Sequence, residues 1–277
     1  MILRLLTFDI EEWFVYEQYP KGGKEYFLPI INELLDDLLN ILDSYNHKAT
    51  FFCLGIIARE YPDVIKRIAH RGHEIACHSD RHIWLNEMTP DDFEKDLQLA
   101  VQSLESVINS KIISYRAPAF SIGSKNKWVF DILSQNDIQV DCSIFPATRS
   151  GGGYNNFNQT GPVIIKTLYG DLLELPVNIY NYSGFKIPFS GGGYFRLLPY
   201  SLISRMANKS EYIMSYFHLR DFDTKQKVVI SWRYFKSYYG IKQMLPKLKR
   251  FLADYEFSPV NAAFEKLQKS TPKVIEF

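Results

Sequence analysis

Two histidines lie four residues apart in the segment His78-Ser79-Asp80-Arg81-His82. On a helical turn, side chains at this spacing lie on one face and can bind the same metal ion. A catalytic zinc site needs a third protein ligand and a water molecule besides two imidazoles. The pair therefore indicates a metal site without completing it, and two surface histidines in a polar loop are the alternative.

An acidic segment follows the apolar run Leu3–Phe8, which is typical of a buried first strand. Because side chains alternate along an extended chain, Asp9 and Glu11 should point to the same side. In parallel α/β folds, residues just past the strands' carboxyl ends face the active site. One carboxylate could then bind a metal ion while its neighbour takes a proton; a solvated acidic loop is the alternative.

Polar side chains also end three later apolar runs. They are Arg116 after Ile112–Tyr115, Asp141 in Ile138–Cys142, and His218 after Tyr212–Phe217. A guanidinium held at such a position could orient a carboxylate. Several strand ends that contribute to one site are typical of barrel enzymes, so the joint pattern indicates more than each residue alone.

The elements that would position these residues alternate between strand and helix. The predicted strands after Leu3–Phe8 are Ala49–Leu54, His73–Cys77, Ile112–Tyr115 and Ile138–Cys142, and the helices are Leu28–Leu42, Ile56–Arg71, Thr89–Asn109 and Lys127–Gln135. This βαβα order predicts an α/β fold with a parallel sheet.

The alternation breaks after Pro146. Val163–Leu168 and Leu172–Ile179 are typical of paired strands, and Ser-Gly-Gly-Gly-Tyr occurs twice, at Ser150–Tyr154 and Ser190–Tyr194. The glycines indicate either flexible turns or bare backbone that approaches a ligand. No linker marks a boundary, so we expect one domain over residues 1–277, with a β- and glycine-rich insertion over residues 147–197.

The composition excludes several classes of protein. The 277 residues are 46% hydrophobic, carry 32 Lys and Arg against 31 Asp and Glu, and contain no long apolar run. A net charge of +1 gives no general attraction to nucleic acid, and no segment could span a membrane. The N-terminus is too short and too soon acidic for a signal peptide, which predicts a cytoplasmic protein. The three cysteines, Cys53, Cys77 and Cys142, are expected to be buried thiols.

Five motifs in chain order resemble those of the NodB-homology polysaccharide deacetylases, carbohydrate esterase family 4. They are Thr7-Phe8-Asp9, His78-Ser79-x-x-His82, Arg116-x-Pro118, Asp141 and His218. The resemblance covers about residues 3–220. Two further segments, Phe8–Phe14 and Gly191–Tyr200, resemble a sub-branch found in exopolysaccharide and cell-surface glycan clusters. The resemblance implies a distorted (β/α)7, TIM-like barrel, here with a β insertion and a C-terminal helical extension.

The resemblance also implies a role for each residue. Asp9 resembles the general base and His218 the general acid. Arg116 then orients the base and Asp141 orients the acid.

The proposed metal ligands depart from the commoner family motif. His78 and His82 resemble the family's histidine pair, but Ile10 replaces the second of two adjacent aspartates. An Asp-x-Asp spacing, found in some members, makes Glu11 the third ligand, with Glu12 in reserve.

The implied activity is removal of an N-acetyl group from an acetamido sugar in a glycan or glycan precursor, with Zn²⁺ or another divalent ion. Zinc polarises a carbonyl and acidifies water, a carboxylate takes the proton, and a protonated histidine assists the leaving amine. A cytoplasmic enzyme would meet nucleotide-linked precursors or substrates at the inner leaflet of a membrane. The alternatives are an O-deacetylase, a metal-dependent amidohydrolase acting on a small non-sugar C–N substrate, and a catalytically silent glycan-binding domain.

Overall fold

The computed structural model describes residues 2–11, 23–149, 151–225, 239–270 and 272–277. Its main sheet has the strand order β12-β2-β3-β4-β5-β6-β8-β7-β13. The bounds are β12 (Phe217–His218), β2 (Thr7–Ile10), β3 (Thr50–Cys53), β4 (Glu74–Cys77), β5 (Ser114–Tyr115), β6 (Val140–Asp141), β8 (Gly170–Glu174), β7 (Val163–Thr167) and β13 (Lys273–Ile275). From β12 to β8 all neighbours are parallel, as the βαβα order predicts.

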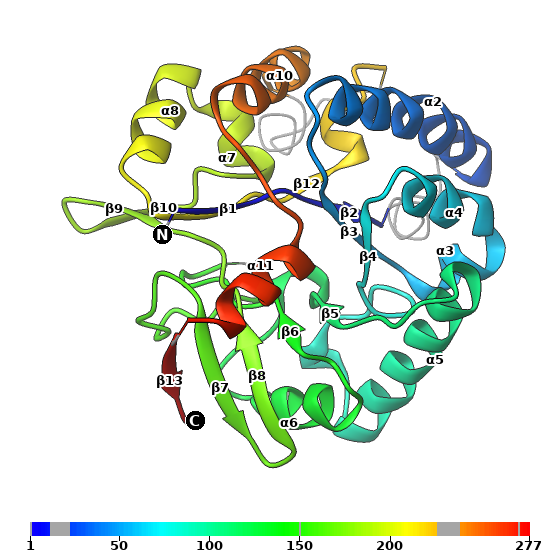
Figure 1. The fold of residues 1–277 in the computed structure, drawn as a ribbon, viewed down its shortest axis with the longest axis vertical. Helices are drawn as coiled ribbons and strands as arrows, with labels where there is room; N and C mark the ends of the chain where they lie inside the picture. The colour runs from blue at the N-terminus through cyan, green and yellow to red at the C-terminus, as the bar shows by residue number, and fades with distance from the viewer. Residues whose placement is uncertain (1, 12–22, 150, 226–238, 271) are drawn as a thin grey trace.

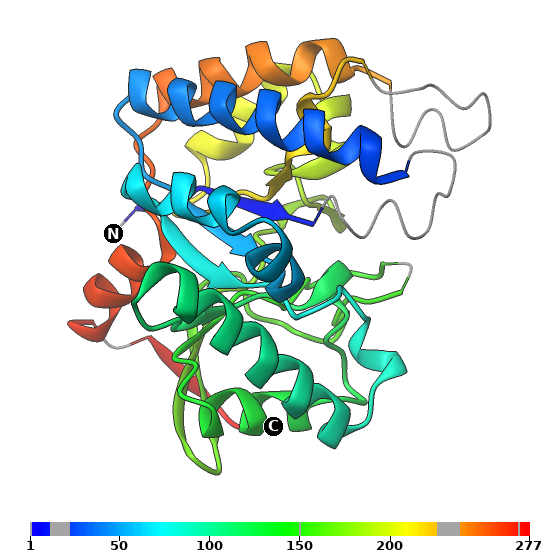
Figure 2. The same cartoon turned by 90° about the vertical axis from the view of Figure 1, so that its right-hand side faces the viewer.

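The strands curve into a distorted α/β barrel whose helices lie outside (Figures 1 and 2). These helices are α2 (Gly23–Ser44), α3 (Gly55–Glu60), α4 (Pro62–His70), α5 (Pro90–Ile108), α6 (Trp128–Gln135), α7 (Gly192–Leu197), α8 (Tyr200–Asn208) and α10 (Met244–Asp254). The predicted fold class is confirmed. None of the described helices is both long and apolar enough to cross a membrane.

The first and last barrel strands each bend in the middle. The predicted run Leu3–Phe8 splits into β1 (Leu3–Leu5) and β2, and its partner splits into β11 (Tyr212–Met214) and β12. At the bend, the Ser215 backbone N–H and hydroxyl both donate to the Leu5 carbonyl, at 2.9 and 2.8 Å. These hydrogen bonds satisfy backbone groups that would lose their partners where the strand pairing is interrupted.

The predicted helix Ile56–Arg71 is two helices, α3 and α4, that meet at Tyr61. Pro62 has no N–H and restricts the residue before it, so Tyr61 leaves the helical region at φ −135° and ψ 57°. Helix α5 starts as expected, with a capping box between Thr89 and Asp92.

The insertion predicted over residues 147–197 is only partly separate from the barrel. Strands β7 and β8 pair with each other as expected, and they do so in antiparallel orientation, but β8 also pairs parallel with β6 and is therefore the next strand of the main sheet. The hairpin of β9 (Tyr180–Tyr182) and β10 (Phe185–Ile187) is a sheet of its own.

The C-terminal extension contains both a helix and a strand. Helix α11 (Val260–Gln268) lies across the amino ends of the strands (Figure 1), where Val260 donates its N–H to the Thr50 hydroxyl at 2.7 Å. Strand β13 then pairs with β7. The extension thus helps to cover one end of the barrel, opposite the carboxyl ends of the strands.

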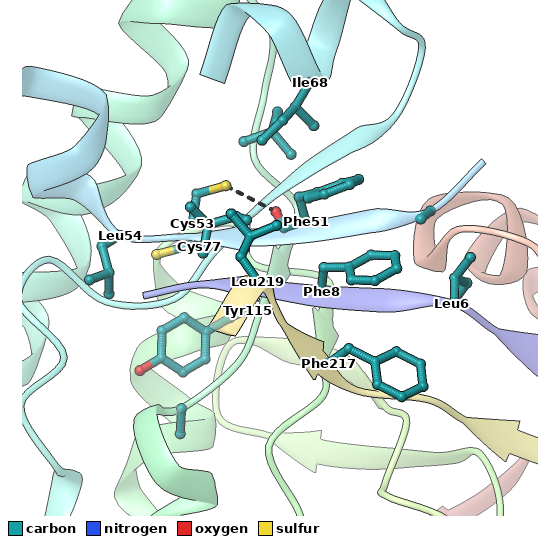
Figure 3. Close-up of a cluster of buried hydrophobic side chains, with 14 of the residues drawn as sticks. Leu6, Phe8, Phe51, Cys53, Leu54, Ile68, Cys77, Tyr115, Phe217 and Leu219 are labelled. Atoms are coloured by element: carbon teal, nitrogen blue, oxygen red, sulfur yellow. Dashed lines mark hydrogen bonds between the residues drawn. The ribbon is translucent and has the colours of Figure 1, made fainter. Parts of the chain in front are cut away.

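Successive side chains of β2 point alternately into the hydrophobic core and into the barrel interior, where the titratable residues lie. Phe8 points outward and stacks on Phe51 at 5.1 Å, with Phe217 at 5.9 Å (Figure 3). Asp9 points the other way, into the barrel, where the fully buried Arg116 lies over the Phe52 ring at 4.0 Å. The strands therefore bury apolar faces under the helices and leave titratable groups inside.

Candidate metal and catalytic site

Three predicted metal ligands converge at the carboxyl ends of β2 and β4. One ligand atom each from Glu11, His78 and His82 lies within 4.8 Å of the others. Glu11 Oε2 is 3.2 Å from His78 Nε2 and 2.7 Å from His82 Nε2, and all three side chains are buried. The reserve ligand Glu12 lies outside the described residues.

The histidine pair is on a loop, so the expected helical turn is wrong. Strand β4 ends at Cys77, and both Ser79 (φ 71°) and His82 (φ 62°) adopt the left-handed region. The Ser79 hydroxyl accepts the His82 N–H at 3.0 Å and holds this turn. The loop directs both imidazoles inward, with ring centroids 5.2 Å apart.

The donor set and its surroundings fit a divalent cation such as zinc. His78 Nδ1–H donates to the Arg116 carbonyl at 2.8 Å, which leaves Nε2 facing Glu11; ligating histidines commonly use their second nitrogen this way. Burial raises the pKa of Glu11, but His218, His82 and Arg220 outweigh it and hold that pKa well below its usual range. Burial lowers the pKa of His82. Two imidazoles and one carboxylate are a ligand set that catalytic zinc uses.

The predicted base lies beside this cluster and is held by arginine. Arg116 Nη1 donates to Asp9 Oδ1 at 2.6 Å and to the Thr7 hydroxyl at 2.8 Å, while its Nε donates to the Cys142 carbonyl at 3.3 Å. These bonds fix the orientation of the Asp9 carboxylate. The second carboxylate oxygen, Oδ2, lies 3.8 Å from His218 Nε2.

The predicted acid faces the same point from β12. His218 stands opposite Asp9 in the strand register, and its Nε2 is 3.3 Å from Glu11 Oε1. Burial lowers the pKa of His218, but the carboxylates of Glu11 and Asp221 outweigh this and raise it to about 9. The His218 imidazole and the Asp9 carboxylate thus flank the three-ligand cluster.

The prediction that Asp141 orients the acid is wrong. His218 Nδ1–H donates to Asp221 Oδ2 at 3.1 Å. Asp141 instead accepts from the Ser143 hydroxyl and shares a hydrogen bond with Glu174, deeper in the barrel. A carboxylate three residues after a histidine is the sequence signal for Asp221, but the resemblance points to Asp141.

Two further residues of the site region carried no predicted role. Arg220 Nη2 donates to Glu11 Oε1 at 3.0 Å and so adds a positive charge to the proposed ligand. Glu174 is fully buried against Asp141, and burial raises the pKa of both carboxyls, so they share a proton. Their partners come from distant parts of the chain, which sequence spacing does not reveal.

Both Ser-Gly-Gly-Gly-Tyr segments pack against loops of the site. In the first, Gly153 donates its N–H to the Phe120 carbonyl at 2.9 Å, and a Cβ at Gly152 would overlap the same carbonyl. In the second, Gly192 donates to the Tyr216 carbonyl at 3.0 Å, and a Cβ at Gly191 would overlap that oxygen. The glycines allow close approach of backbone to backbone.

Comparisons with known families and proteins show what the chain is similar to. The family model for polysaccharide deacetylase matches residues 5–140, and one described as a domain of unknown function (DUF3473) matches residues 142–265. A solved structure from Mycobacterium smegmatis, classed as a polysaccharide deacetylase, superposes with a TM-score of 0.69 at 22% identity, covering 99% of this chain and 93% of that one.

Two curated relatives match shorter stretches. A chitooligosaccharide deacetylase from Bradyrhizobium is 26% identical over 120 residues, which is 43% of this chain and 49% of the relative. A peptidoglycan-N-acetylglucosamine deacetylase from Bacillus cereus is 37% identical over 65 residues, which is 24% of each chain. The chain thus spans half or less of the curated relatives that it matches. The family match identifies residues 5–140 as a polysaccharide deacetylase domain of the NodB-homology, carbohydrate esterase 4 type, and the fold agrees with it.

Proposed function

We propose that this protein is a metal-dependent hydrolase that removes the N-acetyl group from an acetamido sugar of a glycan. The observation that supports this most is the convergence of Glu11, His78 and His82 on one point, with Asp9 and His218 beside it. Such a set combines a metal site with a proton acceptor and a proton donor, which hydrolysis of an amide requires.

In this proposal each protein group has one task. Glu11, His78 and His82 would hold a divalent ion, which would supply Lewis-acid polarisation of the acetamide carbonyl. Asp9, oriented by Arg116, takes a proton from the attacking water.

The acid completes the reaction. His218 is suited to carry a proton because its Nδ1–H donates to the Asp221 carboxylate at 3.1 Å, which stabilises the charged imidazole. It can therefore give its Nε2 proton to the nitrogen of the departing amine, which leaves poorly as an anion.

The alternatives differ in what they require of these residues. A silent glycan-binding domain needs neither the base nor the acid, whereas this chain places a buried Asp9 and a half-buried His218 next to the ligand set. A small-molecule amidohydrolase could use the same groups, so substrate profiling must separate it from a glycan deacetylase.

The direct test is acetate release by purified protein loaded with zinc. We expect activity on N-acetylated chitooligosaccharides or peptidoglycan fragments, and a loss of about 100-fold or more for Asp9→Asn with zinc content unchanged. Activity only on small amides, or binding of glycans that Asp9→Asn leaves intact without any acetate release, would favour the two alternatives respectively.

We propose further that the substrate belongs to a surface or exopolysaccharide glycan and is deacetylated as a precursor. The support is the sequence of Gly191–Tyr200, which resembles that sub-branch. Comparing lipid-linked and nucleotide-linked N-acetyl sugars with oligosaccharide fragments and finished polymers in the acetate assay tests this, since precursors should be the better substrates.

A further inference from the structure

We propose that Asp221 positions the side chain of the acid His218. Arg196, which follows the second glycine segment Ser190–Tyr194, in turn holds Asp221 in place. This inference rests on the proposed function. It gives a task to Asp221, which no motif match identified, and to Arg196, a residue of the Gly191–Tyr200 segment to which the sequence assigned no role.

One oxygen of Asp221 contacts His218 twice. Asp221 Oδ2 accepts the His218 backbone N–H at 3.0 Å and the ring Nδ1–H at 3.1 Å. A carboxylate bound to both the backbone and the ring of one residue fixes the ring's rotation. It also keeps a proton on Nδ1, so that Nε2 is the nitrogen that faces Asp9 and Glu11.

The other oxygen of Asp221 faces a buried cation. Asp221 Oδ1 lies 3.7 Å from Arg196 Nη1, and the two side chains are only 8% and 4% exposed. A buried carboxylate and a buried guanidinium each need an opposite charge, because burial without one is costly. Arg196 thus pairs with the Asp221 oxygen that His218 does not use.

Arg196 is itself anchored from two directions. On one side, Gly192 donates its N–H to the Tyr216 carbonyl, and Gly191 forms a parallel β-bridge with Tyr216. Tyr216 lies two residues before His218. On the other side, Lys247 Nζ of α10 donates to the Arg196 carbonyl at 2.6 Å. The glycines allow this segment to lie directly against Tyr216, just before β12, which brings the guanidinium to Asp221.

Asp221 also caps the short 3-10 helix Leu219–Phe222, so its role could be structural only. The two roles differ in their dependence on the leaving group. An amine must be protonated as it departs, whereas nitrophenolate departs without a proton. Loss of acid positioning should therefore slow acetamide hydrolysis and spare nitrophenyl acetate, while a structural defect should slow both.

The experiment compares wild type with Asp221→Asn, which keeps the shape of the side chain but not its charge. The substrates are an N-acetylated chitooligosaccharide and 4-nitrophenyl acetate, with zinc-loaded protein throughout. We expect kcat on the acetamide to fall about 10-fold or more, with KM and zinc content unchanged, because an amide in this place favours the wrong imidazole tautomer. Hydrolysis of nitrophenyl acetate should stay within about two-fold, and Asp221→Glu should restore part of the acetamide rate.

A matched control is Asp223→Asn in the same segment, since Asp223 Oδ1 accepts the Lys225 N–H at 2.8 Å. It should leave the ratio of the two activities unchanged. Arg196→Gln should shift the ratio in the same direction as Asp221→Asn, to a smaller extent.

Equal losses on both substrates in Asp221→Asn, or no loss on the acetamide, would overturn this inference while the proposed function stands. A wild type that hydrolyses nitrophenyl acetate and releases acetate from no acetamide would overturn the proposed function and this inference together.

Discussion

Arg116 Nη1 lies 2.6 Å from Asp9 Oδ1, and both side chains are buried inside the barrel. They are brought together by the parallel strands β2 and β5, whose residues are more than a hundred positions apart in the chain. The Arg116 guanidinium therefore has two roles: it packs in the barrel interior, and it orients the proposed base Asp9.

Arg116→Lys should therefore impair both stability and activity. A lysine keeps the charge but cannot donate simultaneously to Asp9, Thr7 and the Cys142 carbonyl as the guanidinium does. We expect urea denaturation to show a loss on the order of 3 kcal/mol, since a buried ion pair is left poorly bonded, and kcat for acetate release to fall about 10-fold or more. Wild-type values for both would contradict the role of Arg116.

Glu11→Gln should weaken metal binding. Removing the carboxylate leaves two imidazoles, and zinc affinity should fall about 100-fold or more. Titration with a competing chelator measures the affinity, and the rise in Tm on adding zinc should shrink in parallel because only the folded state holds the ion. Glu87→Gln, at an exposed position in the short 3-10 helix Leu85–Glu87 that follows His82, is the matched control and should bind zinc like wild type.

The shared proton between Asp141 and Glu174 should make stability depend on pH. Burial raises the pKa of Glu174 well above its ordinary 4.5, so the folded state holds a proton that the unfolded state releases. The stabilisation that this proton gives to the folded state is thus fully present below about pH 4.5 and declines as the pH rises toward the pKa of Glu174 in the folded state. Glu174→Gln keeps a donor for Asp141 and should flatten this decline in denaturation curves between pH 4.5 and 8. Glu265→Gln, at an exposed site, should not.

His73 should make the folded protein less stable as the pH falls, which is the opposite of the effect of Glu174. Its Nδ1 accepts the Ala49 N–H at 3.2 Å, and burial lowers the pKa of His73 from 6.5 to about 4. The unfolded state therefore binds the proton first, and the free energy of unfolding should fall by on the order of 2 kcal/mol as the pH drops from 6.5 to 4.

His73→Asn keeps an acceptor near the Ala49 N–H and should remove this part of the pH dependence, measured as the difference between pH 7 and pH 5. His70→Asn, at an exposed position on α4, serves as the control. Identical slopes for wild type and His73→Asn would contradict the assignment.

The sequence predicted most of the site because its residues follow strand ends. Asp9 and Glu11 alternate with Ile10, and the parallel order places the ends of β2, β4, β5 and β12 at one end of the barrel. The convergence of Asp9, Glu11, His78, His82, Arg116 and His218 follows from these two local rules.

The sequence could not predict which carboxylate meets which partner. Asp141 and Asp221 are both buried acids near strand ends, but Asp221 turns back to His218 through a tight 3-10 turn, whereas Asp141 meets Glu174 across the sheet. The sequence also could not predict the left-handed turn that directs His78 and His82, because neither Ser79 nor His82 is a glycine, the residue that usually adopts this conformation.

The amino-acid sequence by itself determined the α/β alternation, the apolar outer faces of the strands and the residue types available for catalysis, because these depend on neighbours in the chain. Only the tertiary structure decided that Asp221 rather than Asp141 contacts His218, that Arg220 contacts Glu11, and that the two glycine segments lie on the site loops. Those pairings depend on strand curvature and on close backbone contacts between distant segments, which no local pattern specifies.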